Sequence, residues 1–287
     1  MKLADVAPSV LELWQVIAPI EAVRPGGELR TVLLGEPIIA TRTEAGPRVV
    51  RKAAPDVPLA VLERYGFIWT SFAETPKPLF PLPEYDEADR RNVVAASFGV
   101  AVSAPRAVEN FLDMGHFPYV HTDILGAEPH TEVKEYDVEI SETRDEVLAT
   151  RCRFFQPRAA LTATEGQEVE YVYRVPHPYC SVLYKSCPAD ESRFDVISIF
   201  CQPVGEEQII AHLLLTQVDE ISTLAEMRRF QQTIFGQDKP ILENQYPKRL
   251  PLDPRAETPI RADKSAIAYR RWLSKKGVNY GVIPQQA

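Results

Sequence analysis

QIIAHLLLTQV (208–218) and ISTLAEMRRFQQTIFGQDKPILENQ (221–245) follow one another closely in the sequence, and this pair decides the fold. The first stretch is short and apolar like a buried strand, whereas the second carries apolar residues at broadly helical spacing. Further strand-like stretches precede the pair, at 92–102, 133–140, 146–156, 169–176, 180–187 and 194–204. Because short turns separate successive strands, we expect an α+β protein in which a curved antiparallel sheet holds a long helix near the C-terminus, with a cavity between them.

The regions flanking this sheet are less regular. Residues 45–60 contain three prolines and mixed charge and predict a loop, and residues 74–91 predict a proline-rich connector. Stretches rich in β-branched and aromatic residues predict short N-terminal strands at 11–19, 29–42 and 65–72. Two further helices are expected, at 105–117 and 265–277.

Composition excludes several classes of protein. The chain has 287 residues with 40 acidic and 32 basic side chains, for a net charge of −8, which disfavours binding to a nucleic-acid backbone. No apolar run approaches the ~20 residues that cross a bilayer. Asp5 and Glu12 interrupt the apolar N-terminal stretch, which makes it a poor signal peptide. We therefore expect a cytoplasmic protein with no membrane partner.

The four cysteines have no spacing typical of a cluster or a metal site. No C-x-x-C or C-x-H occurs around Cys152, Cys180, Cys187 or Cys201. A disulfide framework is not expected in a cytoplasmic chain of this length. These residues are therefore expected to be small apolar fillers in strands.

The densest chemical signal is ENFLDMGHFPYVH (109–121), which places Asp113, His116 and His121 within nine residues. Imidazole binds Fe, Zn, Cu or Ni, and a nearby carboxylate can fix the tautomer of a histidine. On a regular helix, residues five apart point about 140° apart and would not share an ion. A break at Pro118 could bring the two rings together. The alternative is two helix-end histidines with no common partner.

A third ligand would have to come from elsewhere in the chain. The long helix offers Asp238 and Glu243, and Asp238 precedes Pro240, where a local helix break could turn its carboxylate inward. A solvated Asp238 beside Lys239 is the alternative. Two histidines and one carboxylate leave open coordination positions and suit a non-haem Fe(II) that activates O₂. Structural or surface roles are expected for His130, His177 and His212.

These residues resemble the mononuclear-iron motif of Rieske-type non-haem iron oxygenases, E-N-x-x-D-x-x-H-x-x-x-x-H. The motif is matched at Glu109, Asn110, Asp113, His116 and His121. A second family signature is similar to Asp238, Ile241, Leu242, Glu243 and Gln245. Residues 261–273 also resemble the vanillate-demethylase-like branch, and the likeness extends from about residue 90 to 280.

The resemblance implies a helix-grip catalytic domain over 76–287. His116, His121 and Asp238 would bind a mononuclear Fe(II), with O₂ as co-substrate. Asp113 would be the bridge that takes an electron from a neighbouring Rieske cluster. Asn110 and Gln245 are candidate substrate contacts.

The chain departs from the family in its N-terminal part. Residues 12–42 and 63–72 resemble the opening and closing strands of a Rieske domain, yet the C-x-H and C-x-x-H pairs that hold a [2Fe–2S] cluster do not occur. We therefore expect a truncated Rieske-like β remnant over 1–75 that lacks the [2Fe–2S] loops. Electrons would come from NAD(P)H through a separate Rieske-containing reductase. A further structural subunit and a homotrimer are both compatible with this layout.

This layout is similar to that of the Rieske-less components of bacterial methylxanthine N7-demethylation. The resemblance implies a monooxygenase subunit that removes an N-methyl group from a methylated heteroaromatic, such as 7-methylxanthine, with release of formaldehyde. A small aromatic or purine-like ring would suit an apolar cavity with a few polar contacts. Two alternatives stay open, namely an O-demethylase of a methoxylated aromatic acid, which should place an Arg or Lys in the cavity, and a non-catalytic binding or scaffold subunit.

Overall fold

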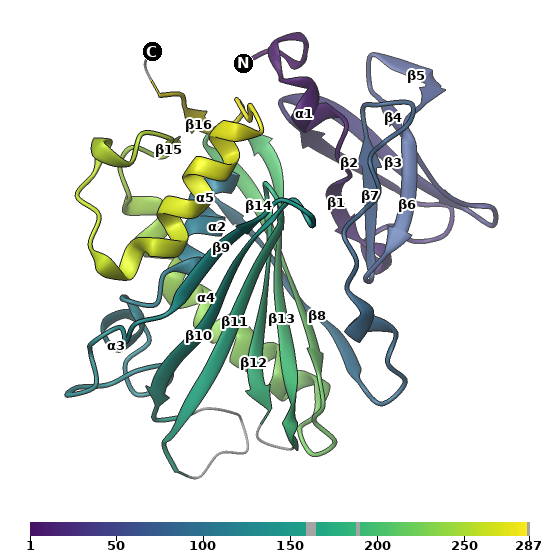
Figure 1. The fold of residues 1–287 in the computed structure, drawn as a ribbon. Helices are drawn as coiled ribbons and strands as arrows, with labels where there is room; N and C mark the ends of the chain where they lie inside the picture. Colours follow the sequence, from purple (N-terminus) through teal and green to yellow (C-terminus); the bar gives the residue numbers. More distant parts are fainter. Residues whose placement is uncertain (159–164, 188–189, 286–287) are drawn as a thin grey trace.

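A seven-stranded antiparallel sheet is the centre of the computed structural model, which describes residues 1–158, 165–187 and 190–285. Its strands fan out in the order β8-β14-β13-β12-β11-β10-β9 (Figure 1). The strands are β8 (Arg91–Val100), β9 (Asp137–Ser141), β10 (Glu146–Gln156), β11 (Gln167–His177), β12 (Cys180–Cys187), β13 (Asp190–Gly205) and β14 (Gln208–Gln217). The antiparallel sheet predicted from the strand-like stretches is confirmed, in nearly the same residue ranges.

Helices cover one face of this sheet. The longest, α4 (Leu224–Asn244), begins with a capping box between Thr223 and Glu226 and passes behind the sheet in Figure 1, in contact with β8. The predicted 105–117 helix is two helices, α2 (Ala104–Leu112) and α3 (Phe117–Val120). The last, α5 (Lys264–Lys275), is followed by its C-cap Lys276 and then by Gly277, whose φ of +67° is the conformation expected of a C′ glycine.

Two small N-terminal sheets cover the opposite face. One has the order β1-β7-β6 and the other β2-β3-β4-β5. Their elements are α1 (Pro8–Leu11), β1 (Gln15–Pro19), β2 (Glu28–Leu33), β3 (Glu36–Thr43), β4 (Gly46–Arg51), β5 (Ala54–Pro58), β6 (Ala60–Arg64) and β7 (Phe67–Ser71). The remaining elements are the strands β15 (Leu250–Pro251) and β16 (Val282–Ile283) and 3₁₀ turns at Leu3–Asp5, Ile20–Ala22, Pro83–Asp86, Pro254–Ala256 and Arg261–Asp263.

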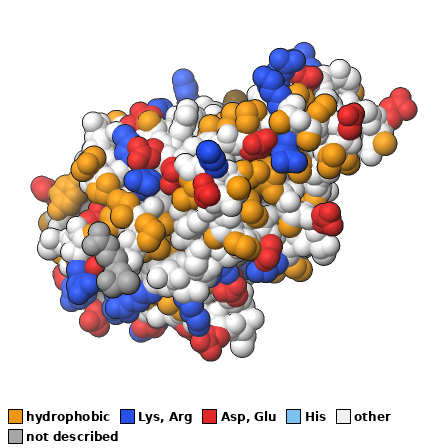
Figure 2. Space-filling model, turned by 90° about the horizontal axis from the view of Figure 1, so that it is seen from above, with side chains coloured by type: hydrophobic (Ala, Val, Ile, Leu, Met, Phe, Trp, Pro, Cys, Tyr) orange, Lys and Arg blue, Asp and Glu red, His pale blue; other side chains and the backbone are white. Residues whose placement is uncertain are grey.

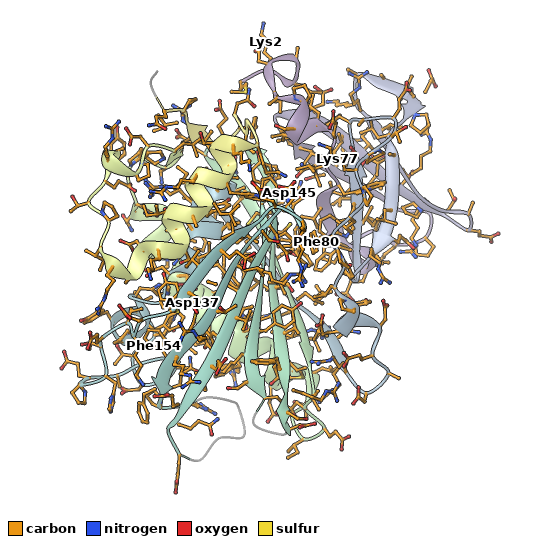
Figure 3. All side chains as sticks on the ribbon, in the orientation of Figure 1. Lys2, Lys77, Phe80, Asp137, Asp145 and Phe154 are labelled. Atoms are coloured by element: carbon orange, nitrogen blue, oxygen red, sulfur yellow. The ribbon has the colours of Figure 1, made fainter. Side chains whose placement is uncertain are left out.

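Aromatic side chains join the N-terminal sheets to the large sheet. Phe80, labelled in Figure 3 between the two parts, lies 6.1 Å from the Trp69 ring of β7 and 5.9 Å from the Phe200 ring of β13, measured between ring centroids. Side chains alternate between the two faces of a strand. Val182 on β12 therefore packs in this outer cluster, whereas Leu183 belongs to the core on the helix side.

The loop predicted over 45–60 is wrong, because the structure has β4 and β5 there. Val49 and Val50 are buried, and β4 pairs with β3 along its length. The prolines Pro55 and Pro58 lie in β5, the edge strand of this sheet, where a missing N–H costs little. The predicted strand over 29–42 is a hairpin of β2 and β3, which turns at Leu34 and Gly35, both with positive φ.

All four cysteines are buried thiols in strands of the large sheet, as the sequence predicts. Within the described ranges, no helix is both long and apolar enough to cross a membrane. Figure 2 shows Lys and Arg interspersed with Asp and Glu among hydrophobic patches on the face it presents.

Candidate metal centre

A short loop after α2 brings the two motif histidines together. Asp113 is the C-cap of α2 with extended backbone, and its Oδ1 accepts a hydrogen bond of 2.7 Å from the Gly115 N–H. His116 immediately precedes α3 and His121 immediately follows it. The chain therefore leaves the helix at Asp113, and Pro118, predicted as the break, lies in the first turn of α3 instead. Proline fits there because first-turn N–H groups have no intrahelical acceptor.

The third side chain, Asp238, comes from α4. The helix break predicted at Pro240 is wrong, since α4 runs without interruption to Asn244. Asp238 instead points inward because Ile234 and Leu242, one turn before and one turn after it, are buried on the same face.

Three ligand-type atoms converge from these elements. His116 Nε2 and His121 Nε2 lie 3.1 Å apart, and Asp238 Oδ1 lies 3.3 Å from the first and 3.1 Å from the second. Ligand atoms about 2.0–2.2 Å from one ion and 90–110° apart are separated by roughly 2.8–3.6 Å, so this triangle has the dimensions of a face around a metal ion. His121 is 1% exposed.

The partners of the histidines explain why a cation belongs at this point. His116 Nδ1 donates to Asp113 Oδ2 at 2.9 Å, and His121 Nδ1 donates to Gln237 Oε1 at 2.9 Å. If the imidazoles are neutral, each Nε2 atom then carries a lone pair and no proton, and both Nε2 atoms lie near Asp238 Oδ1. That carboxylate oxygen accepts no hydrogen bond from any described residue. Three acceptors aimed at one another require a cation, and two imidazoles with one carboxylate suit Fe(II) with open positions. Gln237 was missed by sequence reasoning.

Protons compensate part of this charge when no metal is bound. Burial lowers the pKa of His116, but the hydrogen bond to Asp113 and the nearby carboxylate of Asp238 outweigh this effect and raise the pKa to about 9. The two imidazoles hold the pKa of Asp238 below its usual value despite burial. Metal binding near neutral pH therefore has to release a proton from His116.

The metal-ligand atoms open into a narrow cavity between α4 and the large sheet. Its volume is about 70 Å³, which is small beside the roughly 300–1,000 Å³ of typical ligand sites, so a bicyclic ring can enter only if lining side chains move. Aromatic and aliphatic side chains predominate in its wall, including Phe111, Phe117, Leu213, Ile234 and Phe235. Phe117 is in turn held by Phe154 of β10, labelled in Figure 3, at 5.4 Å between ring centroids.

A second, larger hollow lies on the other side of His116. This outer groove has a volume of about 500 Å³ and contains Asp113, whose side chain is 36% exposed. Asn110 lines both the groove and the cavity. Gln245 is the C-cap residue of α4 and lines only the groove, a position that gives its predicted substrate contact no support.

Buried charges hold α2 in place behind the groove. Glu109 accepts a hydrogen bond of 2.9 Å from Arg106 Nη1 and one of 2.6 Å from Arg270 Nε of α5, and Glu257 pairs with both arginines. Both arginine side chains are almost fully buried. The motif residue Glu109, for which the sequence suggested no role, thus fixes the helix that carries Asn110 and ends at Asp113.

Comparison with known proteins shows which family the chain belongs to. Residues 100–277 match the family model "Vanillate O-demethylase oxygenase C-terminal domain". The chain is 47% identical over 272 residues to the probable methylxanthine N7-demethylase NdmC of Pseudomonas sp. (strain TJI-51), covering 95% of this chain and 96% of that protein. The chain belongs to the vanillate O-demethylase family of Rieske-type oxygenases. The resemblance deduced from the motifs is therefore confirmed, as is the non-haem iron oxygenase class.

More distant relatives agree. Methylxanthine N1-demethylase NdmA of Pseudomonas putida is 26% identical over 224 residues, which are 74% of this chain and 58% of NdmA. The structure of NdmA with caffeine superposes with a TM-score of 0.73 at 18% identity, over 93% of this chain and 91% of that one. That likeness confirms the fold, a sheet-rich α+β structure with a helix gripped near the C-terminus.

Proposed function

We propose that this protein is a monooxygenase subunit that removes the N7-methyl group of a methylxanthine. The observation that carries the proposal is the trio of His116, His121 and Asp238, with three acceptor atoms within 3.3 Å of each other beside an apolar cavity. A scaffold without catalytic function would have no need of such a trio. The substrate class is supported by the 47% identity to a probable methylxanthine N7-demethylase.

The overall reaction consumes one O₂ and two electrons for each methyl group. An N-methyl group, O₂, two electrons and two protons give an N–H group, formaldehyde and water. Iron bound by the trio would supply O₂ activation. Asp113 and Gln237 would keep the ligating imidazoles in one tautomer, and the apolar wall would exclude water from the reacting methyl group.

Electrons must come from another protein, because the sequence has no C-x-H or C-x-x-H pair for a cluster. We propose a Rieske-containing reductase that draws on NAD(P)H and docks at the outer groove, where Asp113 links solvent to His116. We also propose that the chain divides into a β remnant over 1–75 and a catalytic domain over 76–287. A homotrimer and a further structural subunit are proposed for the assembly.

The test is turnover of the iron-loaded protein with 7-methylxanthine, a Rieske reductase and NADH, with formaldehyde as the readout. We expect one formaldehyde per xanthine formed, about one iron per chain and no acid-labile sulfide. Asp113→Asn should keep the iron and lower turnover, because the amide cannot carry the negative charge that orients His116. A protein that holds iron, accepts electrons and releases no formaldehyde from 7-methylxanthine would refute the proposal.

One observation favours the alternative, an O-demethylase of a methoxylated aromatic acid. Such a substrate should require a cation in the cavity, and Lys185 lines it. Release of formaldehyde from methoxybenzoates, but not from methylxanthines, would establish that function instead.

A further inference from the structure

Lys185 is the unexpected side chain of the cavity. It lies on β12, is 6% exposed and lines the cavity together with His116, His121 and Asp238. Strand alternation places Leu183 and Lys185 on the helix side and Tyr184 on the opposite side. Tyr171 of β11 is directly across from Lys185, and the ammonium nitrogen lies 5.9 Å from the centre of its ring.

Burial of this ammonium group is costly, and the nearby carboxylate of Asp195 compensates only part of that cost. Asp195 of β13 is its cross-strand neighbour, and the Oδ1 of that residue accepts the Val218 N–H at 2.9 Å. Burial lowers the pKa of Lys185 to about 8, although Asp195 raises it. The group is therefore mostly protonated at neutral pH and remains a donor.

Tyr173 provides a second polar group on the same wall. It lies two residues from Tyr171 on β11, so both rings face the cavity, and its hydroxyl is buried with no hydrogen-bond partner among the described residues. A buried hydroxyl without a partner costs free energy that a ligand acceptor would recover. The other side chains around these two donors are largely apolar.

We propose that Lys185 and Tyr173 determine substrate specificity by donating hydrogen bonds to the ring carbonyl oxygens of the xanthine. This inference rests on the proposed function and names the groups that select an acceptor-bearing heteroaromatic. An apolar wall alone discriminates weakly between rings of equal size, whereas a ring without an acceptor leaves the buried Tyr173 hydroxyl unpaired and gains no hydrogen bond from the Lys185 ammonium group. The two residues act on binding and orientation, not on the oxygen chemistry.

The test is equilibrium binding by calorimetry to the anaerobic, iron-loaded protein and its variants Lys185→Met and Tyr173→Phe. The ligands are 7-methylxanthine, which has two ring carbonyls, and 7-methylpurine, which has neither. We expect Lys185→Met to weaken 7-methylxanthine binding by about 10–100-fold and Tyr173→Phe by about 3–10-fold. Binding of 7-methylpurine, weaker in the wild type, should change less than about twofold. Lys52→Met, an exposed residue with the same loss of charge, is the control.

Iron content and the thermal midpoint show whether each variant is folded. Unchanged 7-methylxanthine binding in Lys185→Met would overturn the assignment, as would an equal loss for both ligands, which would indicate a structural role. If the wild type bound a methoxybenzoate tightly, and only Lys185→Met lost it, the partner of Lys185 would be a carboxylate. The proposed function fails separately, through absence of formaldehyde from 7-methylxanthine with wild-type protein.

Discussion

Gln237 holds the ring of His121, one of the three proposed metal ligands, in a fixed orientation. Its Oε1 accepts the His121 Nδ1 proton, which leaves Nε2 available as a ligand. We expect Gln237→Leu to weaken iron binding by about 10–100-fold, measured by competition with a chelator. Gln232→Leu is the matched control, because that amide bonds the Ala95 carbonyl on β8 and not a ligand. Equal iron affinity in the two variants would contradict this role.

The site residues differ in how far the sequence could predict them. His116 and His121 lie in one short motif, and Asp238 was found because the chemistry required a third ligand. Gln237 adjoins Asp238 in the sequence, yet its role depends on how α4 is rotated against the loop that carries His121. Lys185 resembled an ordinary strand lysine, since neither its face nor the cavity behind it follows from local sequence.

At the scale of elements, α2 and α5 are joined by buried charges and not only by apolar packing. We expect Glu109→Gln to reduce the free energy of unfolding by about 3–5 kcal/mol, because it leaves Arg106 and Arg270 without their shared buried carboxylate. Guanidinium unfolding of the metal-free protein measures the loss. Glu257→Gln touches the same arginines from a side chain that is 30% exposed, so its loss should be smaller. A reversed order would refute the network's role.

The positions of the helices and strands were predicted largely from the spacing of apolar residues along the sequence. The strands of the large sheet and both long helices were predicted within a few residues, since one face of each is buried against the common core. Two of the errors occurred at prolines. Residues 45–60 form strands because proline is tolerated at a sheet edge, and Pro240 leaves α4 unbroken because packing on both sides of it maintains the helix.

At the scale of the whole molecule, the large sheet has a different partner on each face. The helices lie on one side of the sheet, and the N-terminal sheets pack against part of the other side (Figure 1). Trp69, Phe80 and Phe200 belong to the cluster between these two parts. This arrangement leaves the N-terminal part on the sheet face opposite the cavity. Its proposed origin as a Rieske remnant fits a role in packing, and the proposed docking site of the reductase is the groove beside Asp113.

The buried thiols give a prediction for the intact protein. Burial raises the pKa of Cys152 to about 12 and those of Cys180 and Cys201 above the ordinary thiol value, so hardly any thiolate forms at neutral pH. We expect the native protein to react only slowly with the thiol reagent 5,5′-dithiobis(2-nitrobenzoic acid). In guanidinium, all four cysteines should react rapidly. Rapid stoichiometric labelling of the native state would contradict this expectation.

That burial matters for a catalyst that handles dioxygen. When electrons reach the iron of such an enzyme before a substrate is bound, the enzyme can release superoxide or peroxide. Accessible thiolates of the same protein would be readily oxidised by these products. Sulfur that is protonated and shielded inside strands is a poor nucleophile toward these oxidants. Burial of the four thiols in the strands should therefore limit their oxidation by the superoxide or peroxide that uncoupled turnover releases.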